Sequence, residues 1–381
     1  MPLQLLHQVG HNSNWNVESF QDDRCGDGLI LSPLHQSIST VQRLSQSTRG
    51  ASIFDPQFFL PSSQKPKLLS YPFFPQGVDG GFQTSTFNAH ARDVAEACIR
   101  FQSDQGFRTI VVPTRFIDQL YTDYIDRQRR FTVDAFMEAA GDSPLCLSVA
   151  VTAAMIEDSQ FRTRLLNWIT SYPNVEEVYL MYQHARDSKQ VQDADFLRAC
   201  MDFFREVVGS GLALTVGYTN GEGMLFATAT DLTFTMGSFE NTRIFSVDKF
   251  LQSEGERRGP KARIYLAGLL NWVQFQDAQT IRTRAPDIWA AVYAPTQHAE
   301  QALALPVEPT FNQPQLYKHF FQNMQDYVAT ARAVSPNERR RVLRELLTRA
   351  KAAYAQLQAR GIELERHGRG SHIDPWLAAL A

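Results

Sequence analysis

Short apolar runs alternate with helix-like segments eight times along this chain. Each run is rich in Val, Ile, Leu or Phe and free of charged residues, as expected of parallel strands that are covered on both faces. The segments between the runs have helical spacing and length. Eight strand–helix units in about 300 residues match the count and size of a (β/α)8 barrel. The runs are residues 29–32, 52–54, 109–112, 145–151, 178–181, 212–216, 232–236 and 264–269.

The pattern therefore predicts an α/β protein built as one TIM-type (β/α)8 barrel. We expect a polar lead-in (residues 1–27), the barrel (28–300) and a helical C-terminal extension (301–381). A proline- and aromatic-rich loop, residues 56–88, follows the second predicted strand. Loops of this length are often lids or binding loops, so we predict that it overhangs the barrel mouth and offers aromatic faces for stacking. Inert packing of these aromatics is the alternative.

The cysteines and the apolar stretches predict the cellular compartment of the protein. The four cysteines, at positions 25, 98, 146 and 200, have no metal-site spacing and read as buried free thiols, which favours a reduced, cytoplasmic compartment. No signal sequence begins the chain, and the longest apolar stretch, residues 145–156, is too short to span a bilayer. We expect no membrane association, no metal site and no cofactor.

Positive charge gathers near the C-terminus. From residue 332 to 372, ten Lys and Arg stand against four Glu, a local charge of +6 in a chain of net charge −3. Ser335 and Glu338 predict a capping box, with Pro336 at the first helical position and Gly361 at the stop. The resulting helix, 336–360, has an apolar stripe (Leu343, Leu346, Leu347, Ala350, Tyr354 and Leu357) and many basic residues around it. Its basic face is either simply solvated or contacts nucleic-acid phosphates through Arg340, Arg341 and Arg344.

Barrels carry their chemistry where the strands end, so the polar residues at those points are candidate site residues. Three of them could move protons: Asp55 after the second predicted strand, His184 after the fifth and Glu240 after the seventh. The competing interpretations are an Asp bonded to loop amides and a structural histidine. We predict that these side chains share one pocket with a set of binding residues, namely Arg115, Gln183, Tyr218, Asn220, Glu222, Ser238, Arg243 and Asn271.

The binding set is chosen by chemistry. Arg115 and Arg243 carry planar guanidinium groups that match phosphate or carboxylate. The glycine-rich stretch 217–223 allows a ligand to approach the backbone closely around Tyr218, Asn220 and Glu222. Ser238 lies where many barrels hold a phosphate, between the last two strands. The predicted mouth thus has carboxylates enough for acid–base or nucleophilic work at a glycosidic carbon.

At these positions the chain resembles the tRNA-guanine transglycosylases, including the branch that places deazaguanines in DNA. That family is built on (β/α)8 barrels and carries an Asp at the end of the second strand, within Asp-Ser-Gly-Gly-Phe-Gln. Here the second predicted strand ends Ile53-Phe54-Asp55-Pro56-Gln57, and a related string, Asp79-Gly80-Gly81-Phe82-Gln83, follows in the long loop. The resemblance implies that Asp55 matches the family's strand-end Asp.

The chain also departs from the family. The family's sixth and seventh strands read Val-Gly, a short helix and a nucleophilic Asp. This chain has Val216-Gly217 and a short helix, but the nucleophile's position falls on Phe234, and Asp231 stands three residues early. The family's zinc site, three cysteines and a histidine, has no counterpart. The resemblance thus implies exchange of a nucleobase but leaves its nucleophile unidentified.

We therefore predict a nucleobase-directed transglycosylase- or glycosidase-like protein that acts on a nucleoside or a nucleic acid, DNA or tRNA. Two alternatives stay open. One is a barrel without catalysis that binds nucleic acid or a protein partner within an assembly or homo-oligomer. The other is a sugar or sugar-phosphate hydrolase or lyase. The sequence leaves the substrate and the oligomeric state open.

Overall fold

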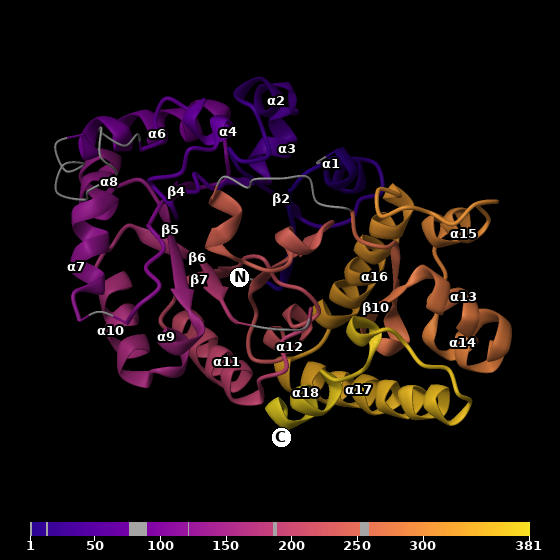
Figure 1. Ribbon diagram of the computed structural model, residues 1–381. Coiled ribbons are helices and arrows are strands. Elements are labelled where there is room, and N and C mark those ends of the chain that lie inside the picture. The colour runs from indigo at the N-terminus through magenta and orange to yellow at the C-terminus, as the bar shows by residue number, and fades with distance from the viewer. Residues whose placement is uncertain (1, 13, 76–89, 121, 186–188, 252–258) are drawn as a thin grey trace.

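The computed structural model describes residues 2–12, 14–75, 90–120, 122–185, 189–251 and 259–381. Within them, eight parallel strands form a nearly closed barrel surrounded by helices, which confirms the predicted α/β fold (Figure 1). The hydrogen-bonded order is β3-β2-β1-β8-β7-β6-β5-β4, and β3 lies against β4 at the remaining seam. The strands are β1 (Gln4–Gln8), β2 (Gly28–Leu31), β3 (Ile53–Phe54), β4 (Ile110–Val112), β5 (Leu145–Thr152), β6 (Val175–Gln183), β7 (Ala213–Val216) and β8 (Thr233–Gly237).

The first strand of the barrel lies inside the segment that the sequence marks as a polar lead-in. β1 pairs with β2 on one side and with β8 on the other. Its polar residues are buried because they are hydrogen-bonded: His7 Nε2 contacts the Cys25 carbonyl at 2.9 Å, and His7 Nδ1 contacts Asn16 at 3.2 Å. A strand with satisfied polar side chains lacks the continuous apolar run by which buried strands are found in a sequence. Asp55 consequently ends the third strand of the barrel, not the second.

The last predicted strand, residues 264–269, is not part of the barrel. It forms β9 (Arg263–Leu266) and a short 3-10 turn, and β9 pairs antiparallel with β10 (Asn271–Gln274). Leu270 takes a left-handed conformation (φ 52°) between these elements, which lets the chain fold back within a few residues. An apolar run of this length reads the same whether its neighbour is parallel or antiparallel, and so the prediction for this strand was wrong.

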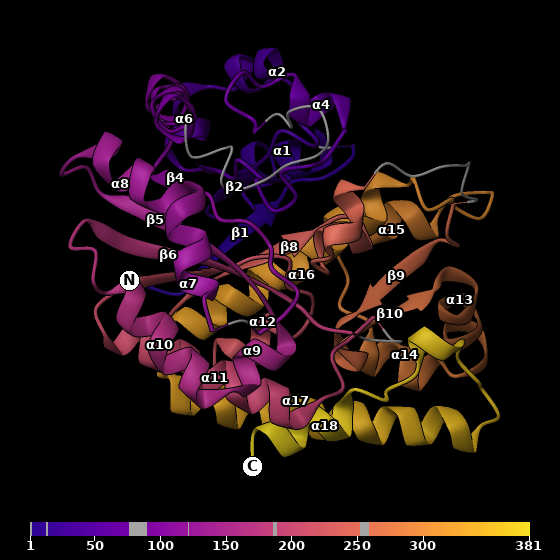
Figure 2. The ribbon, with the colours of Figure 1, turned by 60° about the vertical axis from the view of Figure 1, so that its left-hand side comes forward.

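Helices enclose the barrel on its outside. The helices that follow β1 and β2 are short, and longer helices follow β3, β5 and β6 (Figure 2). The helices are α1 (Asn14–Gln21), α2 (Ile38–Arg43), α3 (Gln46–Gly50), α4 (Pro66–Leu69), α6 (Ala91–Gln105), α7 (Tyr124–Gln128), a π-helical turn (Arg129–Val133), α8 (Asp134–Ala140), α9 (Ala153–Glu157), α10 (Ser159–Ile169), α11 (Ala194–Gly209) and α12 (Gly223–Phe226). Two 3-10 turns, η2 (Glu240–Thr242) and η3 (Val247–Phe250), follow β8 across the mouth.

A second hydrophobic core lies beside the barrel. It joins the β9–β10 hairpin to α13 (Phe275–Arg284), α14 (Pro286–Val292), α15 (Gln297–Leu303) and one end of α17 (Pro336–Ala359). Helix α16 (Pro314–Arg332) packs against β1, α1 and β9 and so lies between the two cores (Figure 2). The short turn η5 (Arg366–Gly368) and α18 (Ile373–Ala379) complete the chain, with α18 against α11 and α17.

The C-terminal basic helix forms as predicted. Ser335 Oγ accepts a hydrogen bond from the Glu338 amide at 3.3 Å, and Gly361 adopts φ +64° just after the helix. Most of the predicted apolar stripe is buried, including Leu343, Leu347, Ala350 and Leu357. One basic residue departs from the expected solvated face. Arg339 is only 4% exposed and forms an ion pair with Asp231 at 2.7 Å.

The loop after β3 is described up to residue 75 only, so the string 79–83 lies outside the described residues. Its described aromatics, Phe58, Phe59, Tyr71, Phe73 and Phe74, are at most 2% exposed. Phe58, Tyr71, Phe73 and Phe74 pack on one another or on Phe54, as in Phe54–Tyr71, with ring centroids 5.6 Å apart. Phe59 packs instead on Phe245 and Phe250, with centroids 5.3 and 5.5 Å apart. For these five residues, the prediction of exposed stacking faces was wrong, because all five rings are buried in packing contacts.

Candidate functional site

The carboxyl ends of the strands enclose a small chamber of buried polar groups. Asp55 follows β3, and Tyr218 lies two residues after β7, across the barrel. Gln57 and Tyr218 both have left-handed backbones, with φ of 58° and 55°. The side-chain amide of Gln57 donates a hydrogen bond to the Tyr218 hydroxyl at 3.2 Å. Residues other than glycine rarely adopt this backbone conformation, and they do so mostly where the surrounding structure holds them there. A hydrogen bond thus joins the two residues with left-handed backbones across the barrel.

Asp55 is the central acid of this chamber. Its side chain is fully buried. One carboxylate oxygen accepts a hydrogen bond from the backbone amide of Gln57 at 3.0 Å, and the other oxygen has no hydrogen-bond partner among the described residues. Burial raises the pKa of Asp55 to about 7, against the opposing effects of the Gln57 amide, Lys249 and Tyr179. A carboxyl group with this pKa is about half protonated at neutral pH, so it can both donate and accept a proton there.

Lys249 faces the same chamber from the 3-10 turn η3. Its Nζ is buried, makes no hydrogen bond within the described part of the chain, and lies 3.3 Å from the centroid of the Tyr218 ring. The rings of Phe245 and Phe250 lie 5.1 and 5.3 Å from the same nitrogen. Burial lowers the pKa of Lys249 well below its usual range, while Asp55 acts to raise it. The chamber thus pairs a carboxyl that resists ionisation with an amine that resists protonation.

Further polar groups line the chamber. Gln8, at the end of β1, receives hydrogen bonds from the Tyr179 hydroxyl at 3.3 Å and the Tyr218 amide at 3.4 Å. Ser32, directly after β2, has a buried hydroxyl without a partner in the described structure. His35 lies nearby, and burial lowers its pKa to about 3, with Lys249 contributing. Native proteins leave few buried polar groups unsatisfied, so this group of them marks a place where a ligand or water completes the bonding.

An open pocket of about 610 Å³ lies above the same end of the barrel. Thr152 and Gln183, from the ends of β5 and β6, form part of its wall. Phe245 belongs both to the pocket wall and to the rings around Lys249, so it borders both the pocket and the chamber. A volume of this size accommodates a nucleoside-sized ligand. The other lining residues are Ala153, Ala154, His184, Ala185, Lys189, Glu240, Ile244, Ser246, Asp248 and His367.

The pocket brings together three predicted site residues. His184 lies 3.9 Å from Asp193 and packs on Phe196, with ring centroids 4.6 Å apart. Glu240 forms an ion pair with Lys189 at 2.6 Å; burial raises its pKa, but the hydrogen bond and charge of Lys189 outweigh it, and the pKa is lowered overall. Gln183 accepts a hydrogen bond from the Val247 amide at 2.8 Å. These residues form the rim of the mouth, whereas Asp55 and Tyr218 lie beneath it.

A second buried polar cluster holds three other predicted residues away from the chamber. Glu222 accepts from the Tyr182 hydroxyl at 2.9 Å, and Asn220 donates to the Lys189 carbonyl at 3.2 Å. Asn271 lies on β10, outside the barrel, and donates to the carbonyls of His367 and Arg369, both at 3.2 Å. These contacts tie loops together. The predicted single ring of site residues therefore divides into a chamber, a rim and this separate cluster.

The remaining predicted binding residues also have local contacts. The Arg115 guanidinium lies 5.9 Å from the Phe131 ring, on the side of the outer helices, and burial lowers its pKa. Ser238 donates to Asn16 at 2.9 Å, in the network that supports His7. Arg243 stacks on Trp272 at 4.3 Å; its Nε and one Nη are buried without partners among the described residues, and burial lowers its pKa to about 10.

On the basic helix, two of the three arginines expected to meet phosphates are engaged within the protein. Arg341 pairs with Glu338 and with Glu345, and Arg344 donates to the Leu380 carbonyl at 2.8 Å. Arg340 is partly buried. Contacts within the protein therefore already engage the guanidinium groups of Arg341 and Arg344.

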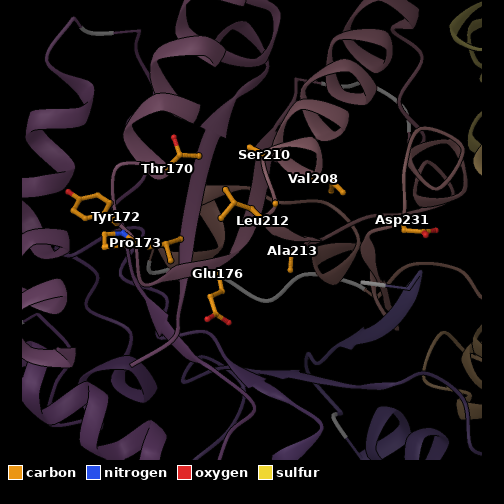
Figure 3. A pocket seen from close by; sticks show the side chains of 11 residues that line it. Thr170, Tyr172, Pro173, Glu176, Val208, Ser210, Leu212, Ala213 and Asp231 are labelled. Carbon is orange, nitrogen blue, oxygen red and sulfur yellow. The ribbon is translucent and has the colours of Figure 1, made fainter. Parts of the chain in front are cut away.

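Another pocket, of about 620 Å³, lies at the opposite end of the barrel, where β6 and β7 begin (Figure 3). Its wall includes Tyr172, Glu176, Ser210 and Asp231, and Asp231 is already paired with Arg339. Barrels place their chemistry at the carboxyl ends of the strands, so we do not assign a site here.

Lys249, Gln8, Ser32, Gln57, Tyr179 and His35 belong to the site, but the sequence does not identify them as site residues. Among the described residues, no group of three or more His, Cys, Asp or Glu side chains could hold a metal ion, and no helix is long and apolar enough to cross a membrane. A scan against protein-family models finds no match for this sequence, and a search of curated proteins finds none either.

Proposed function

We propose that this protein is an enzyme that breaks or exchanges the glycosidic bond between a nucleobase and its sugar. The observation that carries the proposal is Asp55, a buried carboxyl at the strand ends with a free oxygen and a pKa raised to about 7. A nucleobase is a poor leaving group unless it is protonated. An acid that is still partly protonated at neutral pH, at the bottom of a barrel mouth, is placed to supply one.

The pocket above the chamber suits the same reaction. Its volume of about 610 Å³ fits a nucleoside, and its rim presents His184, Lys189 and Glu240 to the edges of a base or sugar. The side-chain oxygen Oε1 of Gln183 accepts a hydrogen bond from the Val247 backbone amide. The side-chain NH₂ group of Gln183 is thereby left as the donor to a substrate. Phe245 borders both the pocket and the chamber, and in this proposal the substrate's sugar approaches Asp55 past this ring.

Two features favour this function over the alternatives. The ionisable group that faces Asp55 is Lys249, not a second carboxylate, whereas most glycoside hydrolases work through two carboxyl groups. A barrel without catalysis gains nothing from unsatisfied buried groups at Asp55 and Lys249, each of which costs about 1–3 kcal/mol. We place a nucleoside or nucleotide ahead of a polymer as substrate, because Arg341 and Arg344 have partners within the protein.

A release assay tests the proposal. Purified protein is incubated with a panel of nucleosides, single-stranded DNA and tRNA, and free base is measured by chromatography, with exchange of labelled guanine measured in parallel. We expect release or exchange with at least one substrate and a loss of about 10²–10⁴-fold in rate for Asp55→Asn. Asp142→Asn, at an exposed position, is the matched control. No turnover of any substrate, or an undiminished rate in Asp55→Asn, would contradict the proposal.

The panel also tests nucleic-acid binding by the basic helix. If Arg340, Arg341 and Arg344 contact phosphates, affinity for DNA or RNA falls with salt, with a log–log slope of about 0.7–0.9 for each contact. Charge reversal at the three positions then lowers both the affinity and the slope. If neither changes, nucleic-acid binding by this helix is excluded and the nucleoside remains the proposed substrate.

A further inference from the structure

Lys249 is the group in the chamber that proton donation by Asp55 does not use. Its Nζ is buried and has no hydrogen-bond partner among the described residues. Burying a charged ammonium without an ion-pair partner is expensive, and a buried lysine usually responds by losing its proton. Desolvation lowers the pKa of Lys249 well below its usual range, against the opposing charge of Asp55, and so favours a neutral amine here. A neutral amine on an apolar wall is a nucleophile.

The backbone that carries Lys249 is fixed at both ends. At the start of η3, the Val247 amide donates to Gln183 Oε1 at 2.8 Å, and the Ser246 hydroxyl accepts from the Asp248 amide at 3.2 Å. At its end, the Phe250 carbonyl accepts from Ser63 Oγ at 2.6 Å. The turn is thus tied to the end of β6 and to the loop after β3. Such anchoring keeps the amine at one place in the chamber and lowers the entropic cost of a reaction there.

The groups that face this amine are of three kinds. Asp55 is the carboxyl group that acts on it, Tyr218 lies under it at 3.3 Å, and His35 lies close enough for Lys249 to lower its pKa. Because burial lowers the pKa of His35 to about 3, that imidazole stays neutral at neutral pH. Asp55 is therefore the one proton donor or acceptor in this set suited to work next to the amine near pH 7.

We propose that Lys249 is the nucleophile of the reaction and forms a covalent imine with carbon C1′ of the substrate's sugar. This inference rests on the proposed function, because it supplies the nucleophile that the strand-end positions lack. It also names the class of compound that the chamber takes: a pentose whose C1′ carries either a nucleobase or, in its open form, an aldehyde.

The step balances with the groups present. The Nζ lone pair attacks C1′, and the bond from C1′ to the base breaks while the base takes the proton of the Asp55 carboxyl. The resulting carboxylate then removes one proton from the alkylated nitrogen. The nitrogen lone pair expels the ring oxygen, which takes that proton from Asp55, and a protonated imine to the open-chain sugar remains. Water hydrolyses this imine to return the free amine and release the sugar.

Borohydride trapping tests the assignment. The whole protein is incubated with 2-deoxyribose 5-phosphate, which presents the open-chain aldehyde, and sodium borohydride reduces any imine to a stable secondary amine. Peptide mass spectrometry then locates the added mass. We expect the adduct on Lys249 in the wild type and its loss in Lys249→Met and Lys249→Arg. Lys351→Met, which removes an exposed lysine paired with Asp374, should trap as the wild type does.

The outcomes separate this inference from the proposed function. Base release by the wild type without an adduct on Lys249 overturns the nucleophile and leaves the function standing. An adduct on Lys249 without release from any substrate supports the reactive amine and counts against the function. Equal labelling of Lys249 and surface lysines overturns the inference. Because the wild-type adduct is mapped directly, misfolding of a variant cannot produce or hide the result.

Discussion

Replacing Asp55 with Asn should make the protein more stable at alkaline pH while lowering the proposed activity by about 10²–10⁴-fold. Burial raises the pKa of Asp55 to about 7, from an ordinary value near 3.9. Between these two values the folded state binds more protons at this site than the unfolded state does. The free energy of unfolding of the wild type therefore falls as the pH rises through this window. Asn has no charge to bury, so the variant loses this penalty.

The magnitude follows from the two pKa values. At 1.36 kcal/mol for each pH unit, the penalty is about 1.5 kcal/mol at pH 5 and about 4 kcal/mol at pH 8. The Asn amide adds buried donors that lack partners, which costs about 1–3 kcal/mol at every pH. The difference between variant and wild type should hence shift by about 2.5 kcal/mol in favour of the variant from pH 5 to pH 8, whatever the amide costs.

Urea unfolding at pH 5, 6, 7 and 8, followed by circular dichroism, measures this difference, provided that the two proteins have equal m-values. Lys249 gives an opposite slope, because its lowered pKa makes stability rise with pH. Asp55 acts to raise the pKa of Lys249, so Asn at position 55 steepens that slope and shifts the difference further in favour of the variant toward pH 8. The exposed Asp142→Asn variant should differ from wild type by less than about 0.5 kcal/mol. If Asp55→Asn instead loses stability relative to wild type toward pH 8, the carboxylate is ionised and paired with Lys249, and the acid role assigned to it is wrong.

Three further changes test other parts of the structure by the same unfolding measurement. Arg339→Met should lower the free energy of unfolding by about 3 kcal/mol, because it leaves Asp231 and two backbone carbonyls without their buried donor. Arg341→Met on the same helix should change it by less than about 1 kcal/mol, because Arg341 is exposed. Equal effects of the two substitutions would show that the buried contacts of Arg339 do not stabilise the fold. Arg24→Gly should raise stability by up to about 1 kcal/mol, because exposed Arg24 has a left-handed backbone (φ 55°), and a loss would show that its side chain makes a stabilising contact. Phe245→Ala should cost about 3–5 kcal/mol and increase trapping of the aldehyde at Lys249 by opening the chamber; unchanged trapping would mean that Phe245 does not control access.

The sequence predicts the barrel because apolar runs report burial on both faces of a strand. It fails at β1 and β9 for different physical reasons. In β1, His7 and Gln8 are buried with hydrogen-bond partners, so polarity there does not mean exposure. In β9, the run is buried as expected, but the left-handed Leu270 turns the chain back into a hairpin. A hydrophobic pattern carries burial and leaves the identity of the neighbouring strand undetermined.

The site shows the same division. Asp55 and Tyr218 could be predicted because they directly follow strands, and barrel geometry alone brings such positions together. Lys249 lies twelve residues after the end of β8 and reaches the chamber only because Gln183 and Ser63 hold its turn in place. Arg339 was expected on a solvated face, and its burial depends on Asp231, more than a hundred residues earlier. Side chains positioned by such distant contacts leave no local signal in the sequence.

The chamber lowers the stability of the folded protein, and this cost favours the proposed reaction over a role in packing alone. Two non-glycine residues with left-handed backbones, Gln57 and Tyr218, cost of the order of 1–3 kcal/mol each, and unsatisfied atoms on Asp55 and Lys249 cost a similar amount each. The sum is comparable with the 5–15 kcal/mol by which a whole domain is stable. Apolar side chains at positions 55 and 249 would relieve much of this cost without altering the barrel. The proposed reaction would use both groups, because it needs a carboxyl that can hold a proton and an amine without one, and burial favours the uncharged form of each.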